Sequence, residues 1–423
     1  MEKIKGIKNI DAFGKNIILV FLGTSLVNLF NLLYQLLIAH RLSPTDFAAF
    51  NALLSILMLI SAPLGTLQTA VTKYSAEFSA QRQIKKIQVL LSALLKKTTI
   101  LATLTFLIFC FASFYIMNKL KISSIASGYI LAILLALSWI TPVLWGGIQG
   151  LELFKWLMSV SVITGALKLC FAFIFIGLGF NIAGALGAFL VPSLIGLIIL
   201  YLPLRNYLFL KTIPDGVNFK EIFLYLFPVA ISSFCFIALV SFDMVLVKYF
   251  FIPQDSGSYS LGQMVGKIFL FLPGAISIVM FPCTSGLNAQ NIDTTSTLKR
   301  SLLYAAILCI IAIFVYNLFP YFILKVLTGK TFLKSIILGR LFSISMSFFA
   351  LLYILIAYFL SIKDLRFIKY IILFTGLQFL AIALFHKSLI QVQLILCINA
   401  ILLFFIHLLL AYKKGIVLAP IAN

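Results

Sequence analysis

The stretch that decides the fold is residues 42–65, LSPTDFAAFNALLSILMLISAPLG, where a helix-start signal leads into a long apolar run. Ser43 is a typical N-cap residue, Pro44 suits the first helical position, and Asp46 places an acidic side chain in the first turn. From residue 47 to residue 70 the chain is long and apolar enough to cross a bilayer. We therefore predict a membrane-spanning helix that begins at this signal.

The composition of the whole chain extends this interpretation. Of its 423 residues 63% are hydrophobic and 10% are charged, and the mean hydropathy is +1.16. Soluble domains are about 45–50% apolar and about 25% charged. The composition excludes a soluble catalytic domain. The net charge of +21 is spread singly or in pairs between apolar runs, without the clustered basic face of a nucleic-acid-binding protein.

A window of about 19 residues predicts an all-α integral membrane protein with about 12 transmembrane helices. The predicted spans are 16–39, 47–70, 98–117, 125–148, 157–178, 182–204, 222–247, 259–281, 301–323, 336–360, 367–385 and 388–411.

The opening stretch has a counterpart about half a chain later. FIPQDSGSYSLGQMVGKIFLFLPG occupies residues 251–274. A constant offset pairs Pro44 with Pro253, Asp46 with Asp255, Phe50 with Tyr259 and Gly65 with Gly274. One explanation is chance similarity between two apolar helices. The other, which the matched Pro and Asp favour, is two related six-helix lobes, residues 1–210 and residues 211–423.

Lys and Arg set the expected orientation, because cytoplasmic loops retain positive charge. Most of the 32 basic residues fall on the side of the N-terminus, as in the segments 73–97 and 299–300. The basic group at Lys325–Lys334 falls on the opposite side. We predict a multi-pass protein of the cell inner (cytoplasmic) membrane with both termini cytoplasmic.

A family resemblance is visible at this point. HRLSPTDFAAFNALLSILMLISAPLGTLQTAVTKYSAEF, residues 40–78, resembles the first loop and second helix of Wzx-type polysaccharide and oligosaccharide flippases of the multidrug/oligosaccharidyl-lipid/polysaccharide exporter superfamily. SFDMVLVKYFF, residues 241–251, is similar to the segment that opens the second half of those proteins. Ala48 departs from the pattern, which usually has Gly after the aromatic residue.

The resemblance implies two six-helix lobes in a V shape, as in MATE transporters, with a central cavity. It also implies transport of a lipid-linked (undecaprenyl-diphosphate) oligosaccharide to the outer leaflet for polysaccharide biosynthesis. The expected partners are this substrate, membrane lipids, and a polysaccharide polymerase or glycosyltransferases of the same pathway. No cofactor, no metal and no enzymatic activity are expected.

Three cations lie within predicted spans, where a Lys or Arg costs about 2.5–3.5 kcal/mol and normally faces a watery cavity or a partner. Lys168 shares a helical face with Ser161 and Thr164, and we expect this face to line the cavity. In the eighth span, Ser260, Gln263 and Lys267 share a helical face that we also expect to line the cavity. Arg340, in the tenth span, lies near the outer boundary of the membrane.

Two interpretations of these cations remain open. They bind the anionic headgroup of the substrate, or they form interior ion pairs. Arg340 is as well placed to reach the membrane surface as to contact a ligand. Asp243, the clear intramembrane acid, pairs with one of the lysines, takes up a proton during transport, or pairs with Lys248 at the interface.

Span one carries a polar stripe whose members are Thr24, Asn28, Asn31 and Gln35. It binds sugar hydroxyls or makes hydrogen bonds between helices. Gly262 and Gly266 predict close helix packing. The prolines within or near the spans are expected to break backbone ladders, and they are Pro63, Pro142, Pro192, Pro228 and Pro273.

Two other functions compete with the flippase. A drug or cation antiporter of the same superfamily would favour acids and aromatic rings in its cavity, whereas here intramembrane cations outnumber acids. A membrane-embedded glycosyl or acyl transferase would need a sizeable polar loop or a His/Asp constellation, and the sequence has neither.

Overall fold

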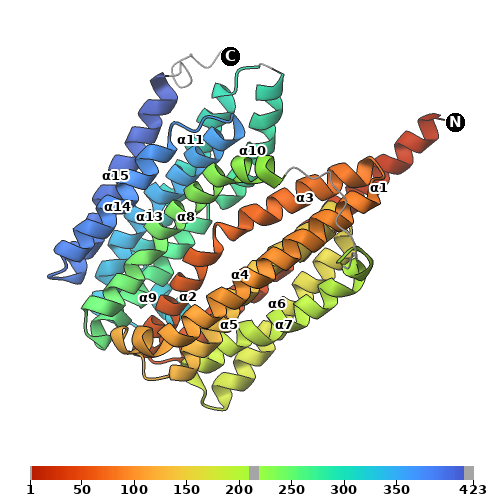
Figure 1. Cartoon of the computed structure of the whole chain (residues 1–423). Helices are drawn as coiled ribbons and strands as arrows, with labels where there is room; N and C mark the ends of the chain where they lie inside the picture. The colour runs from red at the N-terminus through yellow and green to blue at the C-terminus, as the bar shows by residue number, and fades with distance from the viewer. Residues whose placement is uncertain (1, 209–218, 291, 414–423) are drawn as a thin grey trace. The chain divides into compact units, whose positions relative to one another are not determined.

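The computed structural model describes residues 2–208, 219–290 and 292–413, which form fifteen α-helices and no strands (Figure 1). The first seven are α1 (Glu2–Arg41), α2 (Pro44–Ser61), α3 (Leu64–Ala80), α4 (Ile84–Lys119), α5 (Ile125–Gly150), α6 (Phe154–Gly177) and α7 (Asn181–Leu208). The other eight are α8 (Phe219–Phe250), α9 (Pro253–Phe271), α10 (Gly274–Ala289), α11 (Thr295–Leu318), α12 (Pro320–Thr328), α13 (Leu333–Ser361), α14 (Ile368–Leu384) and α15 (Leu389–Lys413).

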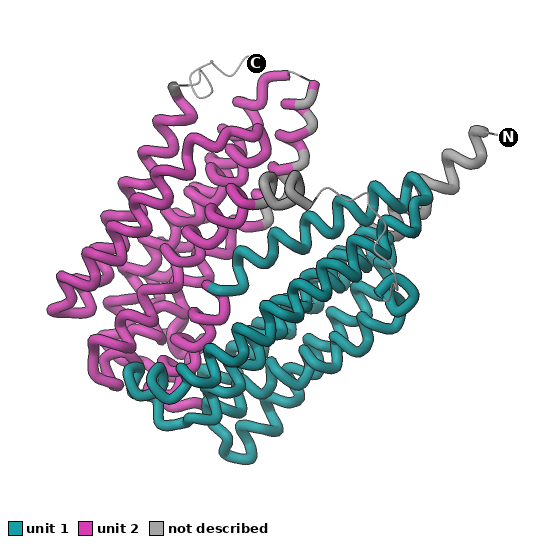
Figure 2. Tube along the Cα trace, in the orientation of Figure 1, with its two compact units in different colours: residues 1–41, 60–226 teal, residues 42–59, 227–423 magenta. Residues whose placement is uncertain are grey.

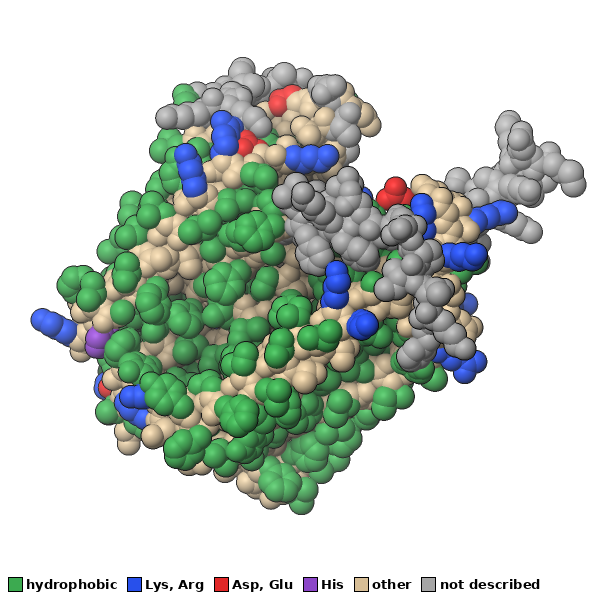
Figure 3. Space-filling view, in the orientation of Figure 1, with side chains coloured by type: hydrophobic (Ala, Val, Ile, Leu, Met, Phe, Trp, Pro, Cys, Tyr) green, Lys and Arg blue, Asp and Glu red, His purple; other side chains and the backbone are tan. Residues whose placement is uncertain are grey.

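Ten of the described helices are long and apolar enough to cross a membrane. They are α1 from Leu19, α2, α4, α5, α6, α7, α8 from Phe227, α11, α13 and α15 to Tyr412. On the face shown in Figure 3, hydrophobic side chains cover the middle of the helices, while Lys and Arg lie mostly toward helix ends. The prediction of an all-α, multi-pass membrane protein is confirmed.

The other two predicted spans differ from this set for identifiable reasons. The span predicted at 259–281 is two helices, because the chain breaks at Pro273 between α9 and α10. The span predicted at 367–385 is α14, whose 17 residues measure about 26 Å at 1.5 Å per residue. The span predicted at 47–70 is also broken, at Pro63, between α2 and α3.

The two broken spans have matching bounds. Helices α2 and α9 begin at Pro44 and Pro253, and helices α3 and α10 end at Ala80 and Ala289, so the repeat offset holds at both ends. Asn51 and Ser260, which are equivalent positions in α2 and α9, hydrogen-bond to each other at 2.8 Å. The similarity between the two stretches therefore extends to where their helices begin, break and end.

Two compact units divide the chain (Figure 2). Unit 1 contains residues 1–41 and 60–226, and unit 2 contains residues 42–59 and 227–423. Helix α2 therefore packs with unit 2, where Lys330 Nζ donates to the Leu42 carbonyl at 2.6 Å. The predicted boundary between residues 210 and 211 lies outside the described residues, and the division into six-helix lobes stays a prediction.

Unit 1 has an apolar core shared by α3 to α7, with members such as Val71, Leu90, Val143 and Leu204. Small residues bring α5 close to α3. A Cβ atom at Gly146 would lie 2.7 Å from the Gln68 carbonyl oxygen. Substitution there requires the helices to separate, because backbone cannot move aside as a side chain does.

In unit 2, glycines likewise allow α9 and α13 to approach closely. A Cβ atom at Gly262 would lie 3.0 Å from Cβ of Leu338, and one at Gly266 would lie 2.9 Å from Cβ of Phe342. The close packing predicted from these glycines is confirmed. It holds α9, which carries several polar side chains, firmly against a largely buried helix.

Candidate functional site

The cavity of unit 1 has one wall on α6. Ser161, Thr164, Gly165 and Lys168 follow the i, i+3, i+4, i+7 spacing of one helical face, and all four line a cavity of about 270 Å³. The Ser161 and Thr164 hydroxyls each donate to a backbone carbonyl one turn earlier at 2.8 Å. Their oxygen lone pairs stay available to accept hydrogen bonds from a ligand.

Lys168 is half-buried, and neutral groups surround its ammonium. Its Nζ donates to Oδ1 of Asn31, and it lies 4.8 Å from the ring centroid of Tyr34 and 4.6 Å from that of Phe189. Both rings are within the range of cation–π attraction. The Tyr34 hydroxyl donates to the Ala185 carbonyl at 2.8 Å, which holds this ring in place.

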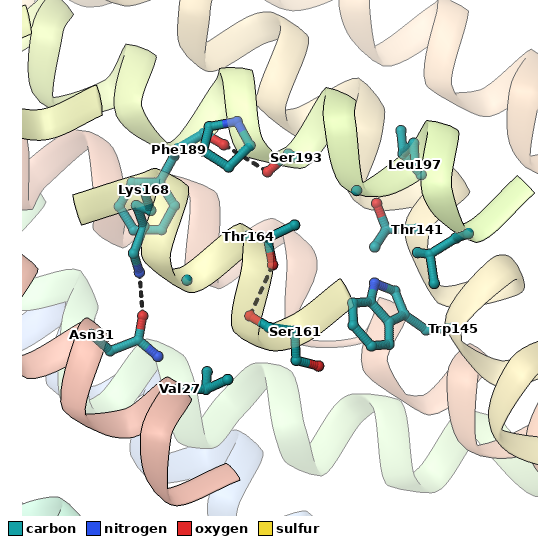
Figure 4. A pocket seen from close by; sticks show the side chains of 14 residues that line it. Val27, Asn31, Thr141, Trp145, Ser161, Thr164, Lys168, Phe189, Ser193 and Leu197 are labelled. Carbon is teal, nitrogen blue, oxygen red and sulfur yellow. Dashed lines mark hydrogen bonds between the residues drawn. The ribbon is translucent and has the colours of Figure 1, made fainter. Parts of the chain in front are cut away.

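Figure 4 shows how the cavity is arranged. Lys168, Asn31 and Phe189 lie at one end, and Trp145 lies at the other, with the α6 hydroxyls between them. The remaining lining residues are Val27, Thr141, Pro192, Ser193, Gly196, Leu197 and Leu200. The cavity thus has a charged end and an end with an indole ring and hydroxyl groups.

No carboxylate contacts Lys168 among the described residues. The acids of unit 1 whose side chains the structure describes are Glu77, in the last turn of α3, and Glu152, in the turn between α5 and α6. Both side chains are exposed. The positive charge in this cavity is therefore balanced only by an amide oxygen and two ring faces.

Unit 2 holds the opposite charge. Asp243, on α8, is fully buried. Its carboxylate accepts a hydrogen bond from the Tyr259 hydroxyl at 2.7 Å and from Nε2 of Gln263 at 3.1 and 3.2 Å. Lys267, one turn beyond Gln263, interacts with the carboxylate electrostatically without a direct ion pair. The side chains that bond Asp243 directly in the described part of the chain are thus a phenol and an amide, and the backbone N–H of Met244 is a further donor.

These contacts continue into other helices. The Tyr259 hydroxyl also lies 3.3 Å from Oε1 of Gln393, whose Nε2 donates to the Ser345 hydroxyl at 2.8 Å. A second set joins Nδ2 of Asn399 to Oε1 of Gln378 at 2.7 Å, and Nε2 of Gln378 to the Leu239 carbonyl at 2.9 Å. Tertiary packing thus gathers buried polar side chains from α8, α9, α13, α14 and α15.

A second cavity, of about 220 Å³, adjoins this network. Its lining is mainly apolar, with Asp243 and Gln378 as two of its polar members. Phe234, Phe242 and Phe379 contribute aromatic rings. Sequence reasoning singled out Asp243 and Gln263 but missed Tyr259, Gln378, Gln393 and Asn399. The signal that was available is the run of amides in two otherwise apolar spans, α14 and α15.

The other predicted residues are dispersed. Thr24 and Asn28 are exposed and Gln35 is half-buried, so Asn31 is the member of the span-one stripe that lines the 270 Å³ cavity. Ser260 bonds Asn51, and Arg340 is exposed on α13.

The family described as "polysaccharide biosynthesis protein" matches residues 13–288. Among curated protein sequences, none matches the chain significantly. Solved structures do resemble it. An inward-facing multidrug resistance MATE family transporter of the MOP superfamily has a TM-score of 0.71 at 15% identity, covering 93% of this chain and 96% of that one.

Two other solved structures show the same likeness. The MATE multidrug transporter DinF-BH in complex with R6G has a TM-score of 0.67 at 16% identity, with 94% of each chain covered. A MOP superfamily transporter from Pyrococcus furiosus, described as having a binding pocket of reverse polarity, has a TM-score of 0.57 at 17% identity, again over 94% of each chain. At these identities the likeness shows that the chain has the fold of MATE transporters.

Proposed function

Because this chain belongs to the polysaccharide biosynthesis protein family, with the fold of MOP superfamily transporters, we propose that it is a flippase for a lipid-linked oligosaccharide. In this proposal it moves an undecaprenyl-diphosphate-linked sugar chain across the cytoplasmic membrane by alternating access and catalyses no reaction. The observation that carries the proposal is the Lys168 ammonium, which lines a cavity without a carboxylate partner among the described residues.

The charge of Lys168 is costly unless a ligand uses it. A lysine within a membrane span costs about 2.5–3.5 kcal/mol, and one amide oxygen with two ring faces compensates only part of that cost. A diphosphate would supply strong charge-assisted acceptors for the same ammonium. In the bound state a phosphate oxygen would replace Oδ1 of Asn31 as the acceptor of the Lys168 hydrogen bond.

The far end of the cavity suits sugars. Trp145 offers a ring face for a pyranose and Thr141 offers a hydroxyl on the same side, while the hydroxyls of Ser161 and Ser193 lie between Trp145 and Lys168. The lipid tail needs no room in the cavity, because the surrounding hydrocarbon accommodates it. A cavity with one cationic and one hydroxyl-rich aromatic end fits an amphipathic phospho-sugar better than an organic cation.

Lys267 and Arg340 are the further cations that we propose for the headgroup. Lys267 interacts with Asp243 in this structure, so protonation of the Asp243 carboxyl would free the lysine charge for an anion. Asp243 is therefore the proposed residue for coupling transport to an ion gradient. The other residues that we propose for transport are the span-one stripe of unit 1 and two polar residues of unit 2. They are Thr24, Asn28, Asn31 and Gln35, and Ser260 and Gln263.

The proposed location is the cell inner membrane with both termini cytoplasmic. The distribution of Lys and Arg supports this orientation. The proposed partners are the polysaccharide polymerase or glycosyltransferases that consume or supply the same lipid-linked sugar.

The test is leaflet transfer of a fluorescent undecaprenyl-diphosphate oligosaccharide in vesicles that contain the full chain. Lys168→Gln should lower the transfer rate about 10- to 100-fold, because it removes a charge-assisted contact. Lys155→Gln is the matched control, since it removes the same charge from the exposed first turn of the same helix. Equal transfer by both variants would contradict the proposal.

One observation favours the competing function of a cation antiporter. The cavity beside Asp243 combines an acid with three phenylalanine rings, which is the chemistry that binds organic cations. The same vesicles loaded with a fluorescent organic cation decide between the two. Efflux that depends on Asp243 and is indifferent to Lys168, without sugar-lipid transfer, would favour the antiporter.

A further inference from the structure

A third hollow, separate from both charged cavities, lies between α10 and α11 of unit 2 and measures about 470 Å³. We call it the α10–α11 groove. Its lining residues are Ile276, Met280, Cys283, Ser296, Thr297, Arg300, Ser301 and Tyr304.

The two walls of the groove differ in chemistry. On α10, Ile276, Met280 and Cys283 follow i, i+4, i+7 spacing and form an apolar wall. On α11 the facing residues are polar: Thr297, Arg300, Ser301 and Tyr304 recur at i, i+3, i+4 and i+7, with Ser296 beside them. The groove is amphipathic along its length.

The polar side chains of the groove have no protein partners among the described residues. Ser301 is only 7% exposed, yet its hydroxyl makes no hydrogen bond, and the same is true of the Thr297 hydroxyl. Elsewhere, helical hydroxyls such as those of Ser161 and Ser193 donate to a carbonyl one turn earlier. These hydroxyls line the groove beside the Arg300 guanidinium and are available to donate hydrogen bonds to a ligand that accepts them.

The equivalent place in unit 1 is filled. The repeat offset places Leu91 of α4 at the position of Arg300 and Ser92 at the position of Ser301. Leu91 is buried and belongs to the apolar core, and the Ser92 hydroxyl donates to the Gln88 carbonyl at 2.6 Å. The same turn is thus solid core in one unit and a polar groove in the other, which shows that the helix order alone does not require the groove.

Nearby acid does not neutralise the groove. Asp293 precedes α11, but its carboxylate accepts the backbone N–H of Thr295 at 3.0 Å and is not among the lining residues. The Arg300 guanidinium is exposed and joins in no ion pair among the described residues.

The groove also lies where a membrane lipid places its phosphate. The polar turns of α11 end at Arg300 and Ser301, and the rest of the helix is an apolar membrane span. Tyr304 lies one turn deeper, as expected for an aromatic residue at the interface. This end of α11 belongs to the side that the Lys and Arg distribution assigns to the cytoplasm, where anionic lipids concentrate.

We propose that the α10–α11 groove binds the headgroup of an anionic phospholipid. The guanidinium of Arg300 and the hydroxyls of Ser296, Thr297 and Ser301 donate to the phosphate, and the glycerol and upper acyl chain lie along Ile276 and Met280. This site is distinct from the Lys168 cavity, and its occupant is a lipid of the membrane rather than the transported cargo.

The experiment is native mass spectrometry of the full chain in detergent, titrated with phosphatidylglycerol or phosphatidylcholine. Arg300→Gln should weaken phosphatidylglycerol binding about tenfold, because it removes a charge-assisted contact. Lys299→Gln is the matched control, since it removes an equal charge from the adjacent residue, which does not line the groove, and should change binding by less than about twofold. Ser301→Leu should also lower binding, because the larger apolar side chain fills the groove.

Each other outcome overturns the proposal. Equal losses in Arg300→Gln and Lys299→Gln would indicate general surface charge, and equal binding of phosphatidylcholine would indicate a groove without anion preference. Displacement of the lipid by an equal concentration of glycerol phosphate would indicate a site for soluble anions. Displacement by substoichiometric undecaprenyl phosphate would assign the groove to the cargo. Because Ser301 is buried, Ser301→Ala and a thermal melt separate groove filling from misfolding.

Discussion

The two units hold buried charges of opposite sign in very different surroundings. In unit 1, Lys168 borders a cavity and touches an amide oxygen and two aromatic rings. In unit 2, Asp243 is fully buried and receives hydrogen bonds from Tyr259 and Gln263, which extend through Gln393 to a further helix. The lysine has little compensation, while the aspartate has its donors in place.

This difference teaches that helix order and charge chemistry are separate properties of the fold. The two broken spans, α2–α3 and α9–α10, match in where they begin and end, and both units use glycines for close packing. Neither feature dictates the sign of the charge in the cavity. The Lys168 ammonium has few hydrogen-bond acceptors around it, so unit 1 is suited to bind an anionic ligand. The Asp243 carboxylate already has hydrogen-bond donors around it, and unit 2 is suited to exchange a proton or cation.

Giving Lys168 a carboxylate partner should produce the largest effect. Asn31→Asp would place an acid on the existing contact, neutralise the lysine, and lower transfer of an undecaprenyl-diphosphate sugar about 10- to 100-fold. The measurement is the vesicle transfer assay, with Ser25→Asp, at an exposed position of the same helix outside the proposed cavity residues, as the control. Unchanged transfer in Asn31→Asp would contradict the claim that transfer needs Lys168 without a carboxylate partner.

Removing the acid of unit 2 should have the next largest effect, on stability. Asp243→Leu leaves the Gln263 amide without its acceptor and weakens the Tyr259 contact, at a cost of about 1–3 kcal/mol in the free energy of unfolding. Asp243→Asn should cost less, because an amide oxygen still accepts the Tyr259 proton. Thermal unfolding of both variants in detergent measures the difference. If Leu is tolerated as well as Asn, the network does not stabilise unit 2.

Close helix packing at glycines in both units predicts similar losses of stability when these glycines are substituted. Gly146→Ala and Gly266→Ala should each destabilise the protein by about 1–2 kcal/mol, and Gly146→Ala by more, because its nearest neighbour is a backbone carbonyl. Gly274→Ala is the control, since a Cβ atom there meets nothing within 4 Å. Unfolding in urea reports all three. A neutral Gly146→Ala would mean that α3 and α5 separate without cost.

The smallest expected effect concerns how the helices begin. Hydrogen bonds from the Thr295 side chain and backbone N–H lower the pKa of Asp293, while the start of α4 in unit 1 has no acid in its first turn. Because the folded pKa lies below the unfolded value, the stabilisation is present above pH 4 and is lost as the pH falls through the folded pKa. Asp293 is exposed, so Asp293→Asn should cost less than about 0.5 kcal/mol at pH 7. Comparing melting at pH 7 and pH 3 tests this, since the variant should differ from the original chain less at pH 3 than at pH 7.

Much of the fold was predictable because apolar length and helix-start signals are local. Ser43, Pro44 and Asp46 marked the start of α2, and its counterpart α9 starts at Pro253 as the repeat implies. The breaks at Pro63 and Pro273 were expected as kinks, but the structure shows separate helices on either side. The association of α2 with unit 2 was not predictable, because it depends on contacts between segments far apart in sequence, such as Lys330 with Leu42.

The candidate site was predictable only in part. Helical spacing grouped Ser161, Thr164 and Lys168 on one face, and the same spacing grouped Gln263 with Lys267. It could not indicate that Tyr34 and Phe189, from two other helices, would flank the Lys168 ammonium. The acceptor role of Asp243 toward Tyr259 likewise depends on how α8 packs against α9.

The sequence by itself determined that this protein is a multi-pass membrane protein, and which few charges lie within its apolar runs. Those properties follow from transfer free energies that act residue by residue along the chain. Only the tertiary structure decided which charge faces a cavity and which is saturated with donors. Hydrogen bonds and ring contacts need atoms within a few ångströms, and helix packing alone brings residues such as Asn31 and Lys168 that close.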